Sequence, residues 1–430
     1  MAPRDEHEDV HERSAAVDSI EGAEEGAALE ARITLVGGNI LSTMGRVIEA
    51  VPRGRPGPQA LADRLGLDKV LASRVLKATR SRDPITAAHR MPGPEPLRRV
   101  VKAAEQLGVE PGIIAEAYRA IDEFDLLIRQ GVGDRSTLDA IVSAWVPEAR
   151  REFELRRKQA AFKAMSQLKG VQCESLLATV ILWPSSDPSK MDVVWVNGLI
   201  GVHRVRPGAP VKLSTRKMGG GPEQRLPVSL DGVPVDNAEG LLLREFCSEP
   251  LLKMRAERVG SAVHYTLADE RFGPASAADI VFAEVNRGEL PRAVPPNSNR
   301  KRYFFAEASM PARRMQFDVL VHESLDTSRP WLRIYDTAFD GVASVNDPAR
   351  DVDAMDMVES IESLGAGVSR FRSTEVPRYA ELLRAVCQRL QYDPALLRGH
   401  RCDVEYPVYG TQVTMVFDPP IEGEPPARPV

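Results

Sequence analysis

Positively charged side chains gather in one short part of the chain. Between Pro52 and Lys102 there are twelve lysines and arginines against four acidic residues, whereas the whole chain carries a net charge of −5. A cationic island in an acidic chain is typical of a surface that binds phosphate groups, because phosphate contacts supply much of the affinity for nucleic acids. The chemistry indicated is therefore the binding of a polyanion, and the alternative is a solvated basic face.

Two short helices would present these charges, and the segment from Pro58 to Thr79 predicts them. Pro58 suits the first turn of a helix, because that position has no intrahelical use for a backbone N–H. Gly66 can adopt the left-handed conformation that ends a helix, and Asp68 is a favourable N-cap for the next one. The second helix places apolar side chains on one stripe and polar ones towards another face, namely Leu71, Val75 and Ala78 against Ser73, Arg74 and Lys77.

The residue types around Gly66 follow a recognisable pattern. A small residue lies one turn before the glycine, apolar residues flank it, and a Ser-Arg-Val-Leu string follows in the second helix. The positions are Ala62, Leu65-Gly66-Leu67 and Ser73-Arg74-Val75-Leu76. This arrangement resembles the helix-turn-helix of bacterial transcription regulators. With a following wing over Pro84 to Pro96, the resemblance extends over about residues 31–100.

The resemblance implies a winged-helix-like domain whose second helix enters the major groove of DNA. One departure is that Val70 and Leu71 stand where such regulators usually carry Ser or Thr, and apolar side chains there could instead be buried. The wing would carry His89 and Arg90. The DNA-binding side chains are then expected to be Lys69, Ser73, Arg74, Lys77, Arg80, Arg82 and Arg90.

The chain is long enough for two or three domains, and its pattern predicts the α+β class. The front is helical, although a Gly37-Gly38 pair weakens the first helix, so a broken helix is one interpretation. The back half has short β-branched and aromatic runs between turn residues, which predict a mainly antiparallel sheet with helices over 238–257, 353–364 and 376–390. In order, the predicted parts are a disordered acidic arm (1–30), a helical domain with the helix-turn-helix (31–146), a connector helix (147–170), an α+β domain (171–418), in which a division near 290–302 is left open, and a Pro-rich tail (419–430).

Several classes of protein are disfavoured by composition. The four cysteines lie far apart, which argues against a disulfide framework and indicates a reducing compartment. The acidic N-terminal segment lacks the apolar stretch of a signal peptide, and no apolar run is long enough to cross a bilayer. A cytoplasmic location without a membrane partner is therefore expected. Because no catalytic, metal-binding or phosphate-loop motif is matched, no catalytic residue, metal ligand or cofactor is predicted.

These observations predict a transcriptional regulator that binds double-stranded DNA. A homodimer is expected, because one recognition helix supplies too few contacts and paired half-sites supply the rest. The back domain would oligomerise or sense an unidentified small-molecule effector. Two alternatives stay open: a protein-interaction or scaffold protein that uses the helix-turn-helix-like domain for dimerisation without binding DNA, and an enzyme whose site lies in the back half.

Overall fold

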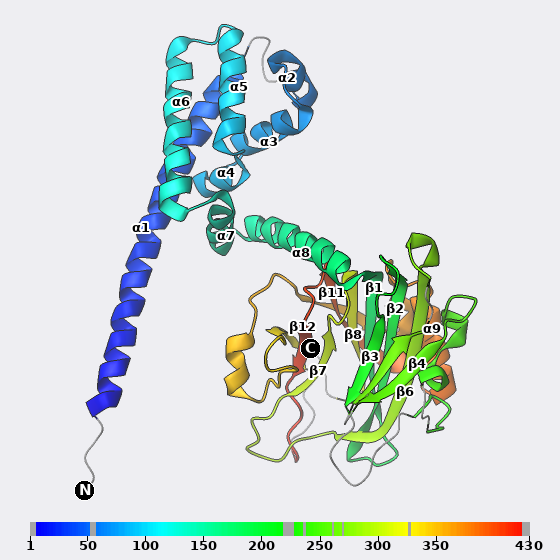
Figure 1. Ribbon diagram of the computed structural model, residues 1–430. Coiled ribbons are helices and arrows are strands. Elements are labelled where there is room, and N and C mark those ends of the chain that lie inside the picture. The colour runs from blue at the N-terminus through cyan, green and yellow to red at the C-terminus, as the bar shows by residue number, and fades with distance from the viewer. Residues whose placement is uncertain are drawn as a thin grey trace. The chain divides into compact units, whose positions relative to one another are not determined.

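The computed structural model describes residues 6–51, 57–217, 228–234, 238–259, 262–268, 271–325 and 328–423. The chain divides into two compact units, Met1–Phe153 and Glu154–Val430. The first is built of helices, and the second contains mixed β-sheets with helices, so the expected α+β class is confirmed (Figure 1). The predicted Pro-rich tail lies outside the described residues from position 424 on, as do positions 1–5 of the predicted acidic arm.

The first unit begins with helix α1 (Glu6–Ala50), which starts inside the acidic segment. From Glu6 on, this segment is helical, where the sequence predicts a disordered arm; its many glutamate and alanine residues are good helix formers. Side chains of α1 are described from Ala27 on. The other helices of the unit are α2 (Pro58–Leu65), α3 (Lys69–Thr79), α4 (Pro84–Arg90), α5 (Pro94–Gln106), α6 (Pro111–Leu126), a π-helical turn (Leu127–Val132) and α7 (Arg135–Trp145).

The Gly37-Gly38 pair does not break α1, so the interpretation of a broken helix is wrong. A Cβ atom added to Gly37 would lie 2.3 Å from the carbonyl oxygen of Pro84 and 3.2 Å from the Cβ of Ala88, both in α4. The missing side chain therefore lets the two helices approach closely. Packing against α4 compensates for the low helix propensity of glycine.

Helices α2 and α3 are joined by the turn that the sequence predicts. Gly66 has φ 60° and ψ 35°, which is the left-handed conformation, and the Leu67 N–H donates to the carbonyl of Ala62 at 3.0 Å. The Asp68 side chain accepts a hydrogen bond from the Leu71 N–H at 2.8 Å and so caps α3. These contacts set the start of α3 and the direction in which it leaves the turn.

Replacing Asp68 by alanine is expected to lower the free energy of unfolding of the first unit by about 1 kcal/mol, because the Leu71 N–H loses its cap. The matched control is Glu110→Ala, since Glu110 is the N-cap residue of α6 but makes no capping hydrogen bond with its side chain. This control should change stability by less than about 0.5 kcal/mol. Urea unfolding followed by circular dichroism measures both; equal losses would contradict a role for the Asp68 cap.

A helix forms where the resemblance predicts a wing. Residues Pro84–Arg90 form α4, and α5 begins at Pro94, so the expected wing over Pro84 to Pro96 is wrong. The local cause is a helix-start signal: Asp83 accepts a hydrogen bond from the Thr86 N–H at 2.7 Å, and proline stands at the first helical position. Proline and glycine in MPGPEP thus end one helix and start the next.

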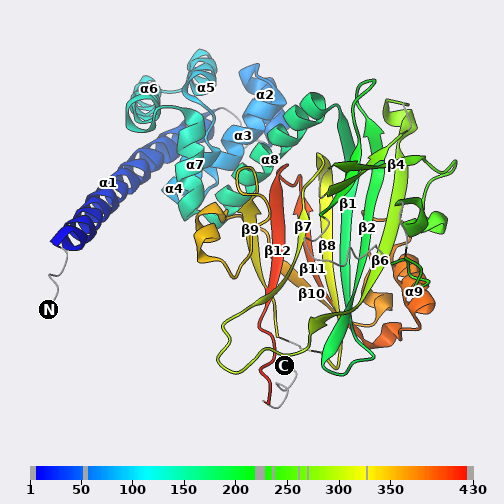
Figure 2. The ribbon, with the colours of Figure 1, turned by 60° about the horizontal axis from the view of Figure 1, so that its bottom comes forward.

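A six-stranded sheet organises the second unit, in the order β10-β11-β8-β1-β2-β6. Strands β1 and β8 pair in parallel, and the other neighbours are antiparallel. Helix α9 packs on one face and the sheet β7-β12-β9 on the other (Figure 2). Because strand side chains alternate, Leu177 and Ile181 of β1 face α9, whereas Leu176 and Val180 face the second sheet. The strands of these two sheets are β1 (Val171–Pro184), β2 (Lys190–Arg204), β6 (Ala278–Pro291), β7 (Arg302–Glu307), β8 (Ala312–His322), β9 (Trp331–Asp336), β10 (Ile361–Ala366), β11 (Leu397–Glu405) and β12 (Thr411–Phe417).

A smaller sheet and helix α9 also belong to the second unit. The sheet has the order β3-β5-β4, and α9 spans Tyr379–Leu390, within the helix that the sequence predicts for 376–390. Helices predicted for 238–257 and 353–364 are wrong: the described residues there form short 3₁₀ turns and the starts of β4 and β10. The strands of the smaller sheet are β3 (Lys212–Lys217), β4 (Met254–Val259) and β5 (Ala262–Leu267).

Helix α8 (Pro147–Lys169) forms where the sequence predicts a connector helix, and the division between the units falls inside it. Its C-terminal part is anchored in the second unit. Lys158 and Glu359 form an ion pair with side chains only 6% and 5% exposed, and Phe162 packs against Tyr406. A basic residue of this helix is thus used for internal packing and is not part of a solvated face.

Candidate nucleic-acid interface

The outward face of α3 carries the polar side chains that the sequence singles out. Leu71, Val75 and Ala78 are 6%, 0% and 0% exposed and belong to the core of the first unit. The residues between them turn away from that core, because successive residues of a helix are rotated by about 100°. The exposed side chains of this face are Lys69, Ser73, Arg74 and Lys77.

Val70 and Leu71 behave differently from each other. Leu71 is buried, whereas Val70 is 69% exposed in the first turn of α3. An apolar residue therefore stands on the open surface next to Lys69 and one turn before Arg74. Of the two apolar residues that could have been buried at this position, Leu71 is buried and Val70 lies on the surface.

The charges on this face are not neutralised by any residue that the structure describes. Lys69, Arg74 and Lys77 form no ion pair with another residue of the described part of the chain. Arg98, which belongs to the same cationic segment, behaves in the opposite way: its guanidinium contacts Glu95, Asp122 and Asp125. The basic residues counted in the sequence therefore include two kinds. Some, such as Arg98, form ion pairs within the described part of the chain, and those on α3 are exposed without such a pair.

The other three expected DNA-binding residues lie after α3. Arg80 is the C-cap residue of α3, Arg82 lies in the link to α4, and both side chains are exposed. Arg90 is half-buried in the last turn of α4, and not on a wing. Arg80, Arg82 and Arg90 likewise form no ion pair within the residues that the structure describes.

His89, which a wing would have exposed, is 5% exposed in α4. Its Nδ1 lies 3.2 Å from Oδ1 of Asp139, and Arg135 contacts both Asp139, at 3.1 Å, and the carbonyl oxygen of His89. Burial acts to raise the pKa of Asp139, but the neighbouring His89 and Arg135 lower it overall. This cluster joins α4 to α7 and is part of the internal packing of the unit.

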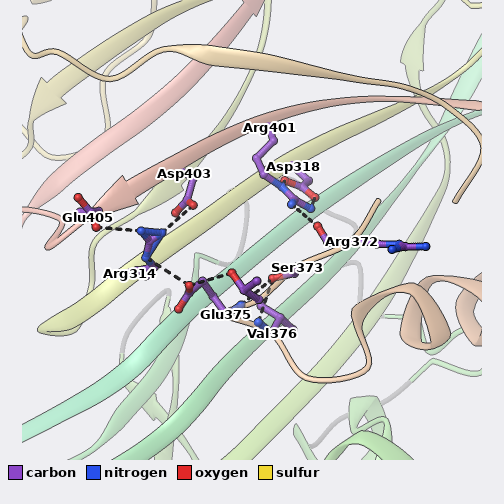
Figure 3. A network of polar contacts seen from close by, with 10 residues as sticks. Arg314, Asp318, Arg372, Ser373, Glu375, Val376, Arg401, Asp403 and Glu405 are labelled. Carbon is purple, nitrogen blue, oxygen red and sulfur yellow. Dashed lines mark hydrogen bonds and ion pairs between the residues drawn. The ribbon is translucent and has the colours of Figure 1, made fainter. Parts of the chain in front are cut away.

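A second polar cluster lies under α9, on the sheet face of the second unit. The Asp318 carboxylate is fully buried and accepts hydrogen bonds from Nε and Nη2 of Arg401 at 2.8 and 2.7 Å. The Tyr379 hydroxyl donates to the same carboxylate at 2.6 Å, and burial together with Asp318 raises the pKa of Tyr379 well above its usual value. Figure 3 shows Arg401 directed at Asp318, and Arg314 placed among Glu375, Asp403 and Glu405.

This cluster is buried in the second unit. Asp318, Tyr379 and Arg401 are buried, and they line none of the three described cavities. Burial acts against the charged form of Arg401, but hydrogen bonds to Asp318 raise the pKa of the guanidinium above its usual value. The groups therefore satisfy one another, which is the condition for burying charge in a sheet.

Sequence reasoning missed a cavity of about 760 Å³ in the second unit, whose lining includes Trp195, Asn197 and Lys212. The local signal is weak: in β2, Asn197 takes an inward place on the strand face that also carries Val193, Trp195 and Leu199. Long-range strand pairing brings the remaining lining residues to it, and that pairing cannot be read from local patterns.

Searches for known relatives give no further assignment: no family model, curated protein or solved structure matches the chain. Within the described ranges, no group of three or more His, Cys, Asp or Glu side chains is arranged to hold a metal ion. None of the described helices is long and apolar enough to cross a membrane.

Proposed function

We propose that the protein is a DNA-binding transcriptional regulator that uses α3 as its recognition helix. The observation that carries this proposal is the open, unneutralised cationic face of α3, directly after the Gly66 turn and capped by Asp68. Cations that satisfy no internal partner retain their full attraction for phosphate, whereas paired ones such as Arg98 do not. No other described surface combines this charge with a helix-turn-helix geometry.

In this mode, the N-terminal residues of α3 approach base edges in the major groove, as recognition helices do. Arg74 can donate two hydrogen bonds to guanine, and Ser73 can bond to either a base or a phosphate. Lys77, Arg80 and Arg82, at and beyond the C-terminal end of α3, are assigned to phosphates. Since α4 replaces the wing, Arg90 contributes as a helix-end cation, and no hairpin reaches into the minor groove.

A homodimer belongs to the proposal, because paired half-sites double the contacts of one short helix. The second unit is then available to hold two copies together or to bind an effector. Its size and separate core are consistent with an independent role.

The test is a mobility-shift assay of the full chain on sheared genomic DNA, at low and moderate salt. The Arg74→Ala plus Lys77→Ala variant is expected to bind at least about tenfold more weakly, since one such contact is worth about 1–3 kcal/mol. Because Lys77 is the one of the two that is assigned to a phosphate, the magnitude of the slope of log affinity against log salt should fall by about 1.

The control is Arg99→Ala plus Lys102→Ala. These two exposed cations of α5 have the same residue types and the same spacing as Arg74 and Lys77, and neither pairs with an acid in the described part of the chain. The control variant should keep nearly full affinity. Equal losses for both variants would mean nonspecific attraction to net charge, and the absence of any shift with the unmodified chain would remove the proposal.

A further inference from the structure

The cavity of about 760 Å³ in the second unit has the size of a small-molecule site, since such pockets typically measure about 300–1,000 Å³. Three parts of the unit form it. The floor is the central sheet at β1, β2 and β6, one wall comes from β7 with the 337–342 loop, and Lys212 and His264 come from the β3-β5-β4 sheet. It is therefore a product of the tertiary fold.

The floor of the cavity has a small residue, an amide and an aromatic ring in one row. Strand pairing places Ala178 of β1 and Phe282 of β6 directly on either side of Asn197 of β2. Ala178 leaves open space beside the Asn197 amide, whereas the paired residues before and after it on the same sheet face have larger side chains. Two positions before Asn197, and therefore on the same face, lies Trp195, whose ring packs against Phe304 of β7 with a centroid distance of 6.5 Å.

Three of the polar groups that line this cavity have no hydrogen-bond partner in the described part of the chain. Among the described residues, none bonds to the Asn197 amide, the Trp195 indole N–H or the Lys212 ammonium group. An amide placed in the middle of an apolar sheet face is costly unless it is bonded. Together, these groups offer three kinds of donor next to aromatic surface.

We propose that this cavity binds a small aromatic carboxylate. The rings of Trp195 and Phe282 provide the apolar surface on which a planar ring packs. The carboxylate oxygens accept hydrogen bonds from the Asn197 amide and Trp195 and pair with Lys212, because charge-assisted hydrogen bonds favour an anionic acceptor. Glu307 of β7 also lines the cavity. The side chains of Glu307 and Lys212 are both exposed, so water weakens the repulsion by Glu307 and the attraction by Lys212 alike, and the Asn197 and Trp195 donors carry most of the preference for an anion. This site does not depend on DNA binding by α3.

The experiment is isothermal titration calorimetry of the full chain with 2-naphthoate, and with 2-naphthalenemethanol and octanoate as matched probes. Saturable binding of naphthoate is expected, with the neutral alcohol and the aliphatic acid each at least about tenfold weaker. No saturable binding of naphthoate at millimolar concentration overturns the proposal. Equal affinity for the alcohol overturns the anionic part of the assignment, and equal affinity for octanoate overturns the aromatic part.

Variants connect the binding to the cavity. Asn197→Asp keeps the size of the side chain but replaces its donors by a carboxylate, and should weaken naphthoate binding at least about tenfold. Lys212→Gln removes an exposed cation and should weaken binding by up to about fivefold. Lys253→Gln removes an exposed lysine of the same unit outside the cavity and should bind normally. Thermal unfolding identifies any variant that misfolds. Normal binding by both folded cavity variants would overturn the assignment.

Discussion

The Arg401→Ala variant is expected to lose about 3–5 kcal/mol of the free energy of unfolding of the second unit. Removing the guanidinium leaves the Asp318 carboxylate, which is 0% exposed, with a buried negative charge and no cation. The hydroxyl of Tyr379 and the amide of Gln316 remain bonded to it, but they cannot balance the charge. Truncating one partner of a buried pair therefore costs far more than the pair itself contributes.

Chemical denaturation that resolves the transition of the second unit measures this loss, because the two units need not unfold together. The control is Arg398→Ala on the same strand, since Arg398 pairs with no acid in the described part of the chain. It should cost less than about 1 kcal/mol. Similar losses for the two variants would contradict the assignment of Arg401 as the essential counter-charge of Asp318.

Alanine substitutions at two glycines of α1 should change the free energy of unfolding in opposite directions. In Gly37→Ala, the new Cβ would lie 2.3 Å from the carbonyl oxygen of Pro84, which is backbone and cannot rotate away. The helices must then separate, and we expect a loss of about 1–3 kcal/mol, as in other overpacked cores. That loss would exceed the gain of about 1 kcal/mol that alanine normally gives in a helix.

Gly45→Ala is the matched control, because a Cβ at Gly45 of the same helix meets nothing within 4 Å. It should stabilise the first unit by about 0.5–1 kcal/mol through helix propensity alone. Thermal or urea unfolding of both variants gives the comparison. Stabilisation by both substitutions would show that α1 and α4 are not in close contact at Gly37.

The local part of the candidate interface could be predicted from the sequence. Pro58, Gly66 and Asp68 act on their own turns of backbone, and the alternation of Leu71 and Val75 with polar residues sets which side of α3 is buried. Such signals need only neighbours within a few residues. The prediction of a wing was wrong because it extended the family pattern over Pro84 to Pro96. The chain has its own helix-start signals there, at Asp83 and Pro84.

By itself, the sequence determined the α+β class, the helix–turn–helix segment and the cationic character around it, because these depend on composition and on neighbouring residues. Only the tertiary structure decided that α1 continues through Gly37, that Arg98 is neutralised while Arg74 stays open, and that Asp318 meets Arg401 across two strands. It also decided that Ala178, Asn197 and Phe282 form one floor. Each of these outcomes depends on contacts between residues far apart in the chain, which no local pattern records.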